Sequence, residues 1–442
     1  MRWICLVLGC VCASSAIGAD FQARIDRVVR TYMERERIPG IAVLAMQDDR
    51  VILDQGWGFA NVEGRVAMTP DAVQPIYSIS KHMTAVAVLA LAEDRLLDVN
   101  EPVALRLTEW FDDEPQLRIV HLLRHTSGLP EFIGLEGIEA IESGTRPGSV
   151  ADVIGIVDRA PRRFTPGTWH SYSNSNYSAL ALIVERAGRK PFFAVPGLED
   201  CATSRSRGVR WSTGYTVAGK PWTPPANLTA TYVGNGGMCA SARSLASWMR
   251  ALAAGRILPA ARVQEMVTTA ALPGGFTPPY GYGLATVTVA GRPAWSHAGG
   301  GEGWGAWVAY LPNDNLTVAV VGNRGWLWST DLGVPIVRAL LEQPEPPRLR
   351  REELSAEERR ALANFCDDGL FDFKIAARQR DVRVTVAPFG APIELWKQAP
   401  GTFVAALRPD TFRLRLRGQS PPEFDWMEHR SYLRPCPKAK QN

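Results

Sequence analysis

Two residues three positions apart, Ser78 and Lys81, are the pair in this sequence best placed to do chemistry. In a helix, residues i and i+3 lie on one face, so the Lys81 nitrogen can reach the Ser78 hydroxyl. A serine hydroxyl is a weak nucleophile at its ordinary pKa, and a lysine neutralised by burial is one way to activate it. Such a pair also arises by chance, so its meaning depends on the residues further along the chain.

Two further short patterns occur later in the chain and contain polar groups of the kind an acyl-transfer site needs. Tyr172 and Asn174 stand two residues apart in a loop-like segment that contains proline and glycine. His297, Gly299 and Gly300 lie near residue 300, in a strand-like segment. The order is therefore S-x-x-K, then Y-x-N, then H-x-G.

These three patterns, in this order and spacing, resemble those of the serine β-lactamases and penicillin-binding proteins. The likeness is to the class C-like branch of serine peptidases, which includes D-aminopeptidases, D,D-carboxypeptidases and β-lactamase-fold esterases. The segments 121–129 and 299–311 match as well, and the resemblance covers residues 20–340. It implies an α+β fold, a β-lactamase/transpeptidase-like antiparallel sheet flanked by helices, and no cofactor.

The resemblance implies the role of each catalytic residue. Ser78 would attack a carbonyl and form an acyl-enzyme, which divides one difficult step into two easier ones. Either Lys81 or Tyr172 would accept the serine proton, and the sequence leaves both open. Free tyrosine titrates near pH 10, so Tyr172 would need positive charge nearby to act as a base.

The same resemblance assigns the substrate-binding residues. Asn174 offers an amide that can orient a substrate amide. The backbone N–H groups of Ser78 and Gly300 are expected to hold the oxyanion, and His297 and Gly299 belong to the strand beside it. The pattern therefore predicts His297, Gly299 and Gly300 as one wall of the site.

His297 is a departure from the β-lactamase pattern, which usually has lysine at this position. Histidine titrates near neutrality, so a fixed positive charge for a substrate carboxylate is weakened above pH 7. We therefore expect a hydrolase of small amides or esters, either D-amino-acid peptides or carboxylic esters. A β-lactamase, a transacylase and a non-catalytic cell-wall-binding protein are the alternatives; the intact serine, lysine and tyrosine argue against the last.

Other reactive residues are interpreted as structural. His121 and His125 are spaced like zinc ligands on a helix, but they lack the glutamate of H-E-x-x-H, so we predict no metal site. Tyr280 and Tyr282 are interpreted as packing residues, and Glu302 as a residue at the rim of the site. The chain contains no G-x-S-x-G elbow, which argues against an α/β-hydrolase.

Periodicity predicts the elements that must position these residues. An amphipathic helix over 21–33 should end at Pro39-Gly40. Strands are expected at 41–46 and 51–59 around a hairpin turn, and at 304–311 and 316–322 around another. Residues 83–97 are apolar on nearly every face, which indicates a buried helix. Helices and loops between strands from both ends favour one shared sheet.

A proline-rich stretch divides the chain. We predict a β-lactamase-related serine hydrolase domain at 19–341, a linker at 342–354 and a C-terminal β-rich domain at 355–442, which resembles a lipocalin-like appendage. The C-terminal region should contain a charged helix at 355–364 and five short strands in a small sheet or barrel. Residues 191–200 depart from the family, because too few residues remain there for its usual helix.

The N-terminal segment 1–18 is predicted to be a cleaved signal peptide, with one arginine, a short apolar run and small residues. The run is too short to span a bilayer, so we expect a periplasmic or secreted protein with no stable membrane span. Four cysteines would then remain, and their positions favour the pairs Cys201–Cys239 and Cys366–Cys436.

The overall composition is that of an ordinary globular protein and indicates no highly charged binding partner. The 442 residues include 46% hydrophobic and 21% charged residues, and the formal net charge is +4. Basic residues are scattered, which argues against nucleic acid as a partner. The expected partners are small-molecule or short-peptide substrates, including peptidoglycan fragments.

Overall fold

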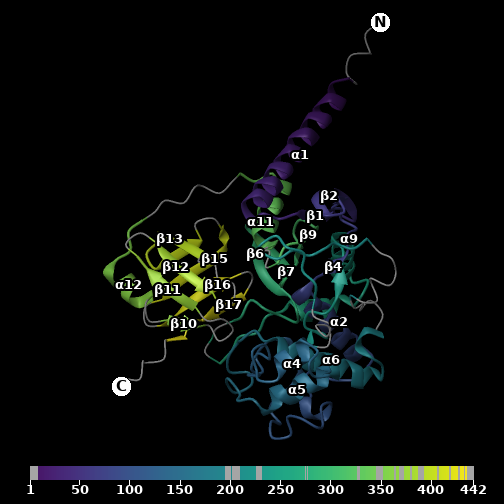
Figure 1. Ribbon diagram of the computed structural model, residues 1–442, viewed down its shortest axis with the longest axis vertical. Coiled ribbons are helices and arrows are strands. Elements are labelled where there is room, and N and C mark those ends of the chain that lie inside the picture. The colour runs from purple at the N-terminus through teal and green to yellow at the C-terminus, as the bar shows by residue number, and fades with distance from the viewer. Residues whose placement is uncertain are drawn as a thin grey trace.

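The structure is a computed structural model of the chain. It describes residues 8–194, 201, 210–224, 231–273, 275, 277–325, 329–344 and 352–362, and then 365–367, 373–378, 381–386, 393–405, 408–417, 420–426, 429–432 and 434–435. The larger part of this structure is a mixed sheet-and-helix unit. A second, smaller β-rich part lies beside it (Figure 1).

A seven-stranded antiparallel sheet, in the order β3-β2-β1-β9-β8-β7-β6, forms the centre of the larger part. Strand β1 from the N-terminal side pairs directly with β9 from far along the chain, Ile41 opposite Gly322. The prediction that strands from both ends share one sheet is therefore confirmed. The bounds are β1 (Gly40–Gln47), β2 (Arg50–Asn61), β3 (Val66–Ala67), β6 (Ala285–Val289), β7 (Arg292–Gly300), β8 (Gly305–Leu311) and β9 (Leu316–Gly322).

The turn between β1 and β2 is shorter than the expected four-residue segment, because Gln47 already pairs with Arg50. Only Asp48 and Asp49 remain in the turn, and both have positive φ, 48° and 65°. Two positive φ values make a tight turn whose twist matches that of the strands. Aspartate tolerates this conformation better than most residues, so the polar pair in the sequence suits the turn.

Both faces of the central sheet are buried, which explains the continuous apolar runs of its inner strands. Ile41, Val43 and Ala45 of β1 belong to one hydrophobic core, and Ala42 and Leu44 to the other. Successive side chains of a strand point to opposite faces, so each run contributes to both cores. The first core packs against α1 (Leu8–Glu36) and α11 (Ser329–Leu340), and the second against the helical layer.

The helical layer comes from the middle of the chain, and part of it lies below the sheet in Figure 1. Its central helix α2 (Ser80–Glu93) has buried side chains at all positions from 80 to 89, as the sequence predicted, although it ends at Glu93 and not at 97. Its other helices are α3 (Ile119–Leu123), α4 (Ile138–Glu142), α5 (Val150–Arg159), α6 (Asn174–Gly188), α9 (Ala242–Ala253) and α10 (Ala260–Val267).

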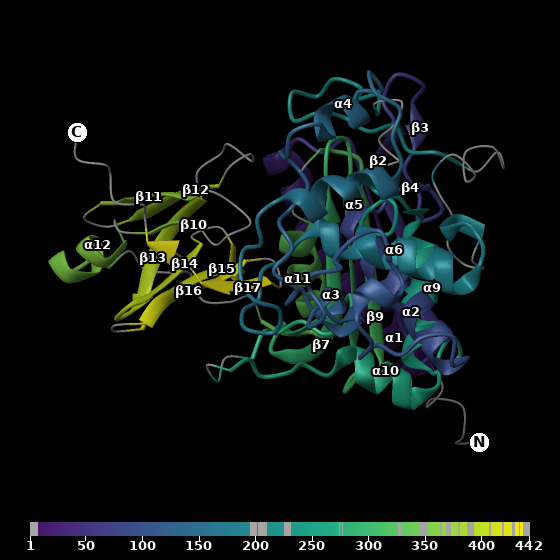
Figure 2. The same cartoon turned by 90° about the horizontal axis from the view of Figure 1, so that it is seen from below.

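The β-rich part is a second seven-stranded antiparallel sheet in which each strand pairs with the next, from β11 to β17. The five expected strands are present and two more come after them. Helix α11 contacts strands of both sheets, and Figure 2 shows it between them. The bounds are α12 (Ala356–Leu362), β11 (Phe373–Ala377), β12 (Val382–Val386), β13 (Ile393–Ala399), β14 (Thr402–Ala405), β15 (Arg408–Arg417), β16 (Ser420–Trp426) and β17 (His429–Tyr432), with β10 (Phe365–Asp367) paired to β18 (Arg434–Pro435).

Several sequence predictions concern the cysteines, the linker and the N-terminal segment. The disulfide Cys201–Cys239 is present, which confirms that pairing. Cys436 and residues 195–200 and 345–351 lie outside the described residues, so the second pairing, the altered segment after Pro191 and the linker stay predictions. The first turns of α1 include part of the predicted signal segment (Figure 1). No helix in the described ranges is long and apolar enough to cross a bilayer.

Candidate active site

Ser78 lies in a single 3-10 turn, Tyr77–Ile79, immediately before α2, and not in the helix itself. The turn begins with a positive φ of 47° at Tyr77, a conformation that is unfavourable for an L-residue. The loop between β7 and β8 helps to hold this turn, because the Tyr77 hydroxyl donates to the Glu302 carbonyl at 2.5 Å. The strained turn leaves the half-buried Ser78 at the positive N-terminal end of α2, which favours negative charge on its oxygen.

Lys81 is completely buried and its ammonium nitrogen has three acceptors. Nζ lies 2.9 Å from Ser78 Oγ, 2.7 Å from Asn174 Oδ1 and 2.8 Å from the Asn235 carbonyl. Burial lowers the pKa of Lys81 to about 7, and the negative charge of Glu131 opposes that shift. The predicted pairing of Ser78 with Lys81 is therefore present in the geometry, and the lysine is able to change protonation state near neutral pH.

Tyr172 lies beside this pair and is almost entirely buried. Lys81 Nζ is 4.8 Å from the centre of the Tyr172 ring, a distance typical of a cation–π contact. The His125 ring also packs against Tyr172, with the two ring centres 4.3 Å apart. His125 Nδ1 also accepts the Ser173 N–H at 3.2 Å, so it fixes the chain next to Tyr172. The structure thus brings Tyr172 to Lys81, as predicted.

Asn174 is the first residue of α6 and joins Lys81 to a carboxylate. Its Oδ1 accepts from Lys81, and its Nδ2 donates to Glu131 Oε2 at 3.1 Å. The Asn174 backbone N–H donates to the same oxygen at 2.8 Å. Glu131 is half-buried and burial raises its pKa. Glu131 was not among the predicted site residues, although it lies only two positions after the family-like segment 121–129.

Asn235 also belongs to the site without having been predicted from the sequence. Its backbone carbonyl accepts from Lys81, while its side-chain amide donates to Ser178 Oγ at 2.8 Å and the Thr231 carbonyl at 3.0 Å. The disulfide at Cys239 joins β5 (Cys239–Ala240) to Cys201 just beyond this loop. The glycines on both sides of Asn235 were the available signal, because such a stretch permits a close backbone approach.

His297 lies on β7 with both ring nitrogens in hydrogen bonds. Nδ1 is 2.6 Å from the Ala298 carbonyl and therefore carries the proton of that bond, and Nε2 is 2.9 Å from the Tyr280 hydroxyl. The His297 side chain is only 1% exposed. The interpretation of Tyr280 as a packing residue was therefore incomplete, because its hydroxyl also holds His297 and its ring packs 6.1 Å from that of Tyr172.

Gly299 allows β7 to approach the nucleophile turn. A Cβ at this position would lie 1.9 Å from the Ile76 carbonyl oxygen and 3.1 Å from the Ser78 nitrogen. The glycine of the H-x-G pattern is thus required by sterics. Gly300 ends β7, pairs with Gly305 and is exposed, so its backbone is accessible beside the turn.

The remaining residues singled out in the sequence make contacts of other kinds. His121 accepts a backbone N–H from Arg118, and the Tyr282 ring lies 5.0 Å from the Arg124 guanidinium. Glu302 contributes its backbone carbonyl, which accepts from the Tyr77 hydroxyl. Within the described ranges, no group of three or more histidine, cysteine or acidic residues is arranged to hold a metal ion.

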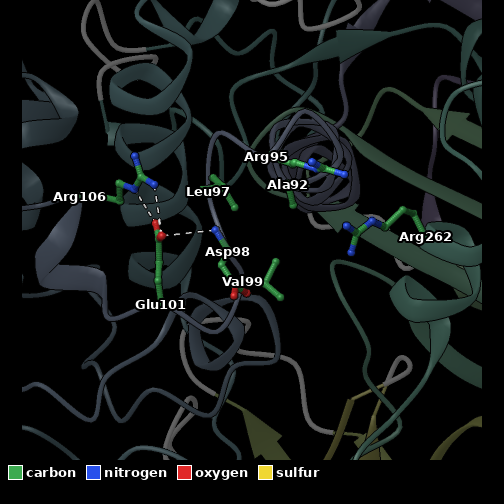
Figure 3. Close-up of a pocket in the computed structure, with 8 residues that line it drawn as sticks. All are labelled: Ala92, Arg95, Leu97, Asp98, Val99, Glu101, Arg106 and Arg262. Atoms are coloured by element: carbon green, nitrogen blue, oxygen red, sulfur yellow. Dashed lines mark hydrogen bonds and ion pairs between the residues drawn. The ribbon is translucent and has the colours of Figure 1, made fainter.

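A separate pocket of about 480 Å³ opens at the C-terminal end of α2, roughly 16 Å along the helix from Lys81 (Figure 3). Two of its arginines are already paired, since Glu101 accepts from Arg106 at 2.5 Å and Arg262 contacts Glu93 at 2.9 Å. It shares no residue with the site around Ser78. The lining residues are Ala92, Arg95, Leu97, Asp98, Val99, Glu101, Arg106 and Arg262.

Comparisons with known proteins agree with this geometry. The family model described as Beta-lactamase matches residues 25–326. A D-aminopeptidase of Gluconobacter oxydans is 27% identical over 325 residues, which cover 69% of this chain and 59% of that protein. The match thus spans about three fifths of this curated relative.

Solved structures share the fold. An octameric penicillin-binding protein homologue from Pyrococcus abyssi is 20% identical, with a TM-score of 0.66, and the match covers 92% of this chain and 99% of that one. A D-amino acid amidase from Ochrobactrum anthropi SV3 is 20% identical, with a TM-score of 0.61, over 73% of this chain and 99% of that one. Because the match to the Pyrococcus abyssi protein covers 92% of this chain, it includes much of the β-rich part. Because the family model covers more than half of the chain and its three patterns meet at one site, this chain belongs to the β-lactamase family.

Proposed function

We propose that this chain is a serine amidase that cleaves small amides through an acyl-enzyme on Ser78. The observation that carries the proposal is the placement of the buried Lys81 nitrogen 2.9 Å from Ser78 Oγ, with two uncharged carbonyl-type oxygens as its other partners. A neutral lysine has two N–H bonds and one lone pair. If Asn174 and Asn235 accept the two N–H bonds, the lone pair faces Ser78 Oγ.

The reaction is a consequence of that arrangement. The Ser78 hydroxyl gives its proton to Lys81 Nζ as Oγ forms a bond to the substrate carbonyl carbon. The carbon–nitrogen bond then breaks, and the leaving amine takes the proton from the ammonium. In the second half, water loses a proton to the same group and its oxygen bonds to the acyl carbon; the ester bond breaks and Ser78 recovers its hydrogen. Tyr172, against the ammonium, stabilises the charged form.

The proposed substrates are amides and short peptides of D-amino acids. Support comes from the relatives, one a D-aminopeptidase and another a D-amino acid amidase. The charge of the site adds a physical reason. His297 is held between Tyr280 and a carbonyl in place of a fixed cation, and Glu131 brings negative charge close to Lys81. Such a site favours a free amino group over a carboxylate.

Export is part of the proposal and is supported by the N-terminal sequence alone. We infer a periplasmic or secreted enzyme from the signal-like segment 1–18. Peptides released from peptidoglycan are one source of D-amino-acid substrates in that compartment. N-terminal sequencing of the protein recovered from culture medium and from periplasm tests this point, and an intact residue 1 in the cytoplasm contradicts it.

The activity is tested by hydrolysis of D-alanine p-nitroanilide, L-alanine p-nitroanilide, p-nitrophenyl acetate and a chromogenic β-lactam. We expect the D-anilide to have the highest kcat/KM and Ser78→Ala to lose at least three orders of magnitude while keeping the wild-type fold. Ser78→Ala activity within tenfold of wild type contradicts the mechanism. Two outcomes favour the alternatives. Hydrolysis of benzylpenicillin, with no lasting increase in the mass of the intact protein, favours a β-lactamase. Preference for p-nitrophenyl acetate favours an esterase.

A further inference from the structure

Glu131 is a carboxylate at the site that none of the three sequence patterns includes. It lies in the loop before α4, and the loop is fixed to the start of α6. The Pro130 carbonyl accepts from the Ser173 and Ser175 hydroxyls at 3.1 Å and 2.6 Å. Glu131 Oε1 accepts the Ile133 N–H at 3.2 Å, and Oε2 accepts both N–H groups of Asn174. The carboxylate therefore has a defined position.

The first consequence concerns the orientation of the Asn174 amide. An amide has one face that accepts and one that donates. An ionised carboxylate only accepts, so Glu131 requires the Nδ2 side of Asn174 to point toward it. Oδ1 then faces Lys81, where it accepts at 2.7 Å. A flipped amide would oppose the N–H bonds of Lys81 with its own and would lose both contacts.

The second consequence concerns charge. Glu131 is separated from Lys81 by only one amide group, and its negative charge stabilises the ammonium that burial disfavours. The groups that face Lys81 are the rings of Tyr172 and Tyr177, at 4.8 Å and 5.9 Å, besides Glu131. Those that act on or respond to Glu131 are Lys81, the Tyr232 hydroxyl and the Glu142 carboxyl. Both neighbours of Glu131 other than Lys81 are acidic groups.

We propose that Glu131 is a positioning residue of the active site. It orients the Asn174 amide toward Lys81, and its charge sets the pH at which Lys81 releases its proton and becomes able to activate Ser78. The catalytic consequence rests on the proposed serine amidase function, whereas the effect on Lys81 itself does not depend on any substrate.

The direct test is an NMR titration of lysine side chains labelled at Cε and Nζ. The chain has seven lysines, so the resonance that disappears in Lys81→Arg identifies Lys81. Glu131→Gln removes the charge, while its amide oxygen still accepts from Asn174. We expect the titration midpoint of Lys81 to fall by at least roughly half a pH unit. Glu136→Gln is the matched control, because this exposed carboxylate lies in the same loop five residues further on.

A midpoint in Glu131→Gln that stays at the wild-type value, or rises, overturns the proposal. An equal fall in Glu136→Gln also overturns it, because the effect would then be one of general surface charge. If Glu131→Gln does not fold, Glu131→Ala serves, because it also removes the charge: a fall in the midpoint supports the proposal, and an unchanged midpoint contradicts it.

Kinetic measurements on variants of Glu131 test its role in catalysis. For Glu131→Gln, the acid limb of kcat/KM should move to lower pH by the same amount as the Lys81 midpoint. For Glu131→Ala, which removes the acceptor as well, kcat should fall more than in the glutamine variant. A purely structural role would lower stability without moving the acid limb. If wild type hydrolyses no amide, the proposed function fails, and the NMR titration still decides the role of Glu131.

Discussion

The replacement Gly299→Ala tests whether close contact between β7 and the nucleophile turn is needed for catalysis. The added Cβ would lie 1.9 Å from the Ile76 carbonyl oxygen, closer than such atoms approach in proteins. The neighbour is backbone, so no side chain can rotate out of the way. The strand and the turn must therefore move apart by about 1 Å or more before the methyl group fits.

That displacement acts directly on the reacting atoms, because Ser78 lies in the turn that must move. Its Oγ is 2.9 Å from Lys81, whose nitrogen is held from two other sides. A displacement of about 1 Å at a reacting group can cost about a hundredfold in rate. Overpacking a well-filled interior costs roughly 1–3 kcal/mol in the free energy of unfolding. We therefore expect kcat to fall about a hundredfold with a moderate loss of stability.

The assay is kcat and KM for D-alanine p-nitroanilide, together with urea unfolding. Gly188→Ala is the matched control, because the same methyl group at the end of α6 would have its nearest neighbours at 3.8 Å or more. There alanine should leave activity unchanged and add up to about 1 kcal/mol of stability through its better helix propensity. Gly299→Ala with wild-type kcat refutes the argument that this contact positions Ser78.

Two further predictions concern buried polar groups. Tyr280→Phe removes the hydroxyl that holds His297 Nε2, so unfolding should cost about 1–3 kcal/mol less and kcat/KM should fall; an unchanged urea midpoint and rate would exclude this positioning role. Burial lowers the pKa values of His82 and His170 to about 3 and about 4, below the unfolded value near 6.5, so stability is lost as pH falls below 6.5. Between pH 7 and pH 5 the two histidines together should lower the free energy of unfolding by roughly 4 kcal/mol. Urea unfolding of His82→Leu at the two pH values should show about half of that loss. An equal loss in the variant contradicts the assignment.

Much of the site could be predicted because its residues recur in short, ordered patterns. Ser78 and Lys81 stand at a spacing that brings them together in any helical turn, and Tyr172 and His297 are recognisable relative to them. The hairpins around the two pairs of sheet strands were equally accessible, since alternating or continuous apolar runs end at polar turn residues. Even so, the residue-level geometry differed: Ser78 precedes its helix, and the first hairpin turn contains only Asp48 and Asp49.

Glu131 and the hydroxyl contact of Tyr280 could not be predicted, and Asn235 had only its flanking glycines as a signal, because each contact depends on segments that meet only in the folded chain. Glu131 is 43 residues from Asn174, and Asn235 is 154 residues from Lys81. No periodicity marks such contacts, and a carboxylate in a loop is usually solvated. The extra strands β16 and β17 were missed for a different reason, since prolines and charged residues weaken their alternating pattern.

The arrangement around Lys81 explains how a lysine can be a base near neutral pH and still have a positive charge to offer. A carboxylate in direct contact would hold it as an ammonium, and a wholly apolar site would keep it neutral over most of the pH range. Here three uncharged oxygens make the direct contacts, and the carboxylate of Glu131 lies one amide further away. The lysine pKa of about 7 is the result of two opposing effects, since burial lowers it and the charge of Glu131 at that distance raises it. Asn174 therefore does two things at once: it gives Lys81 a neutral partner, and it keeps Glu131 far enough away for the proton to be released.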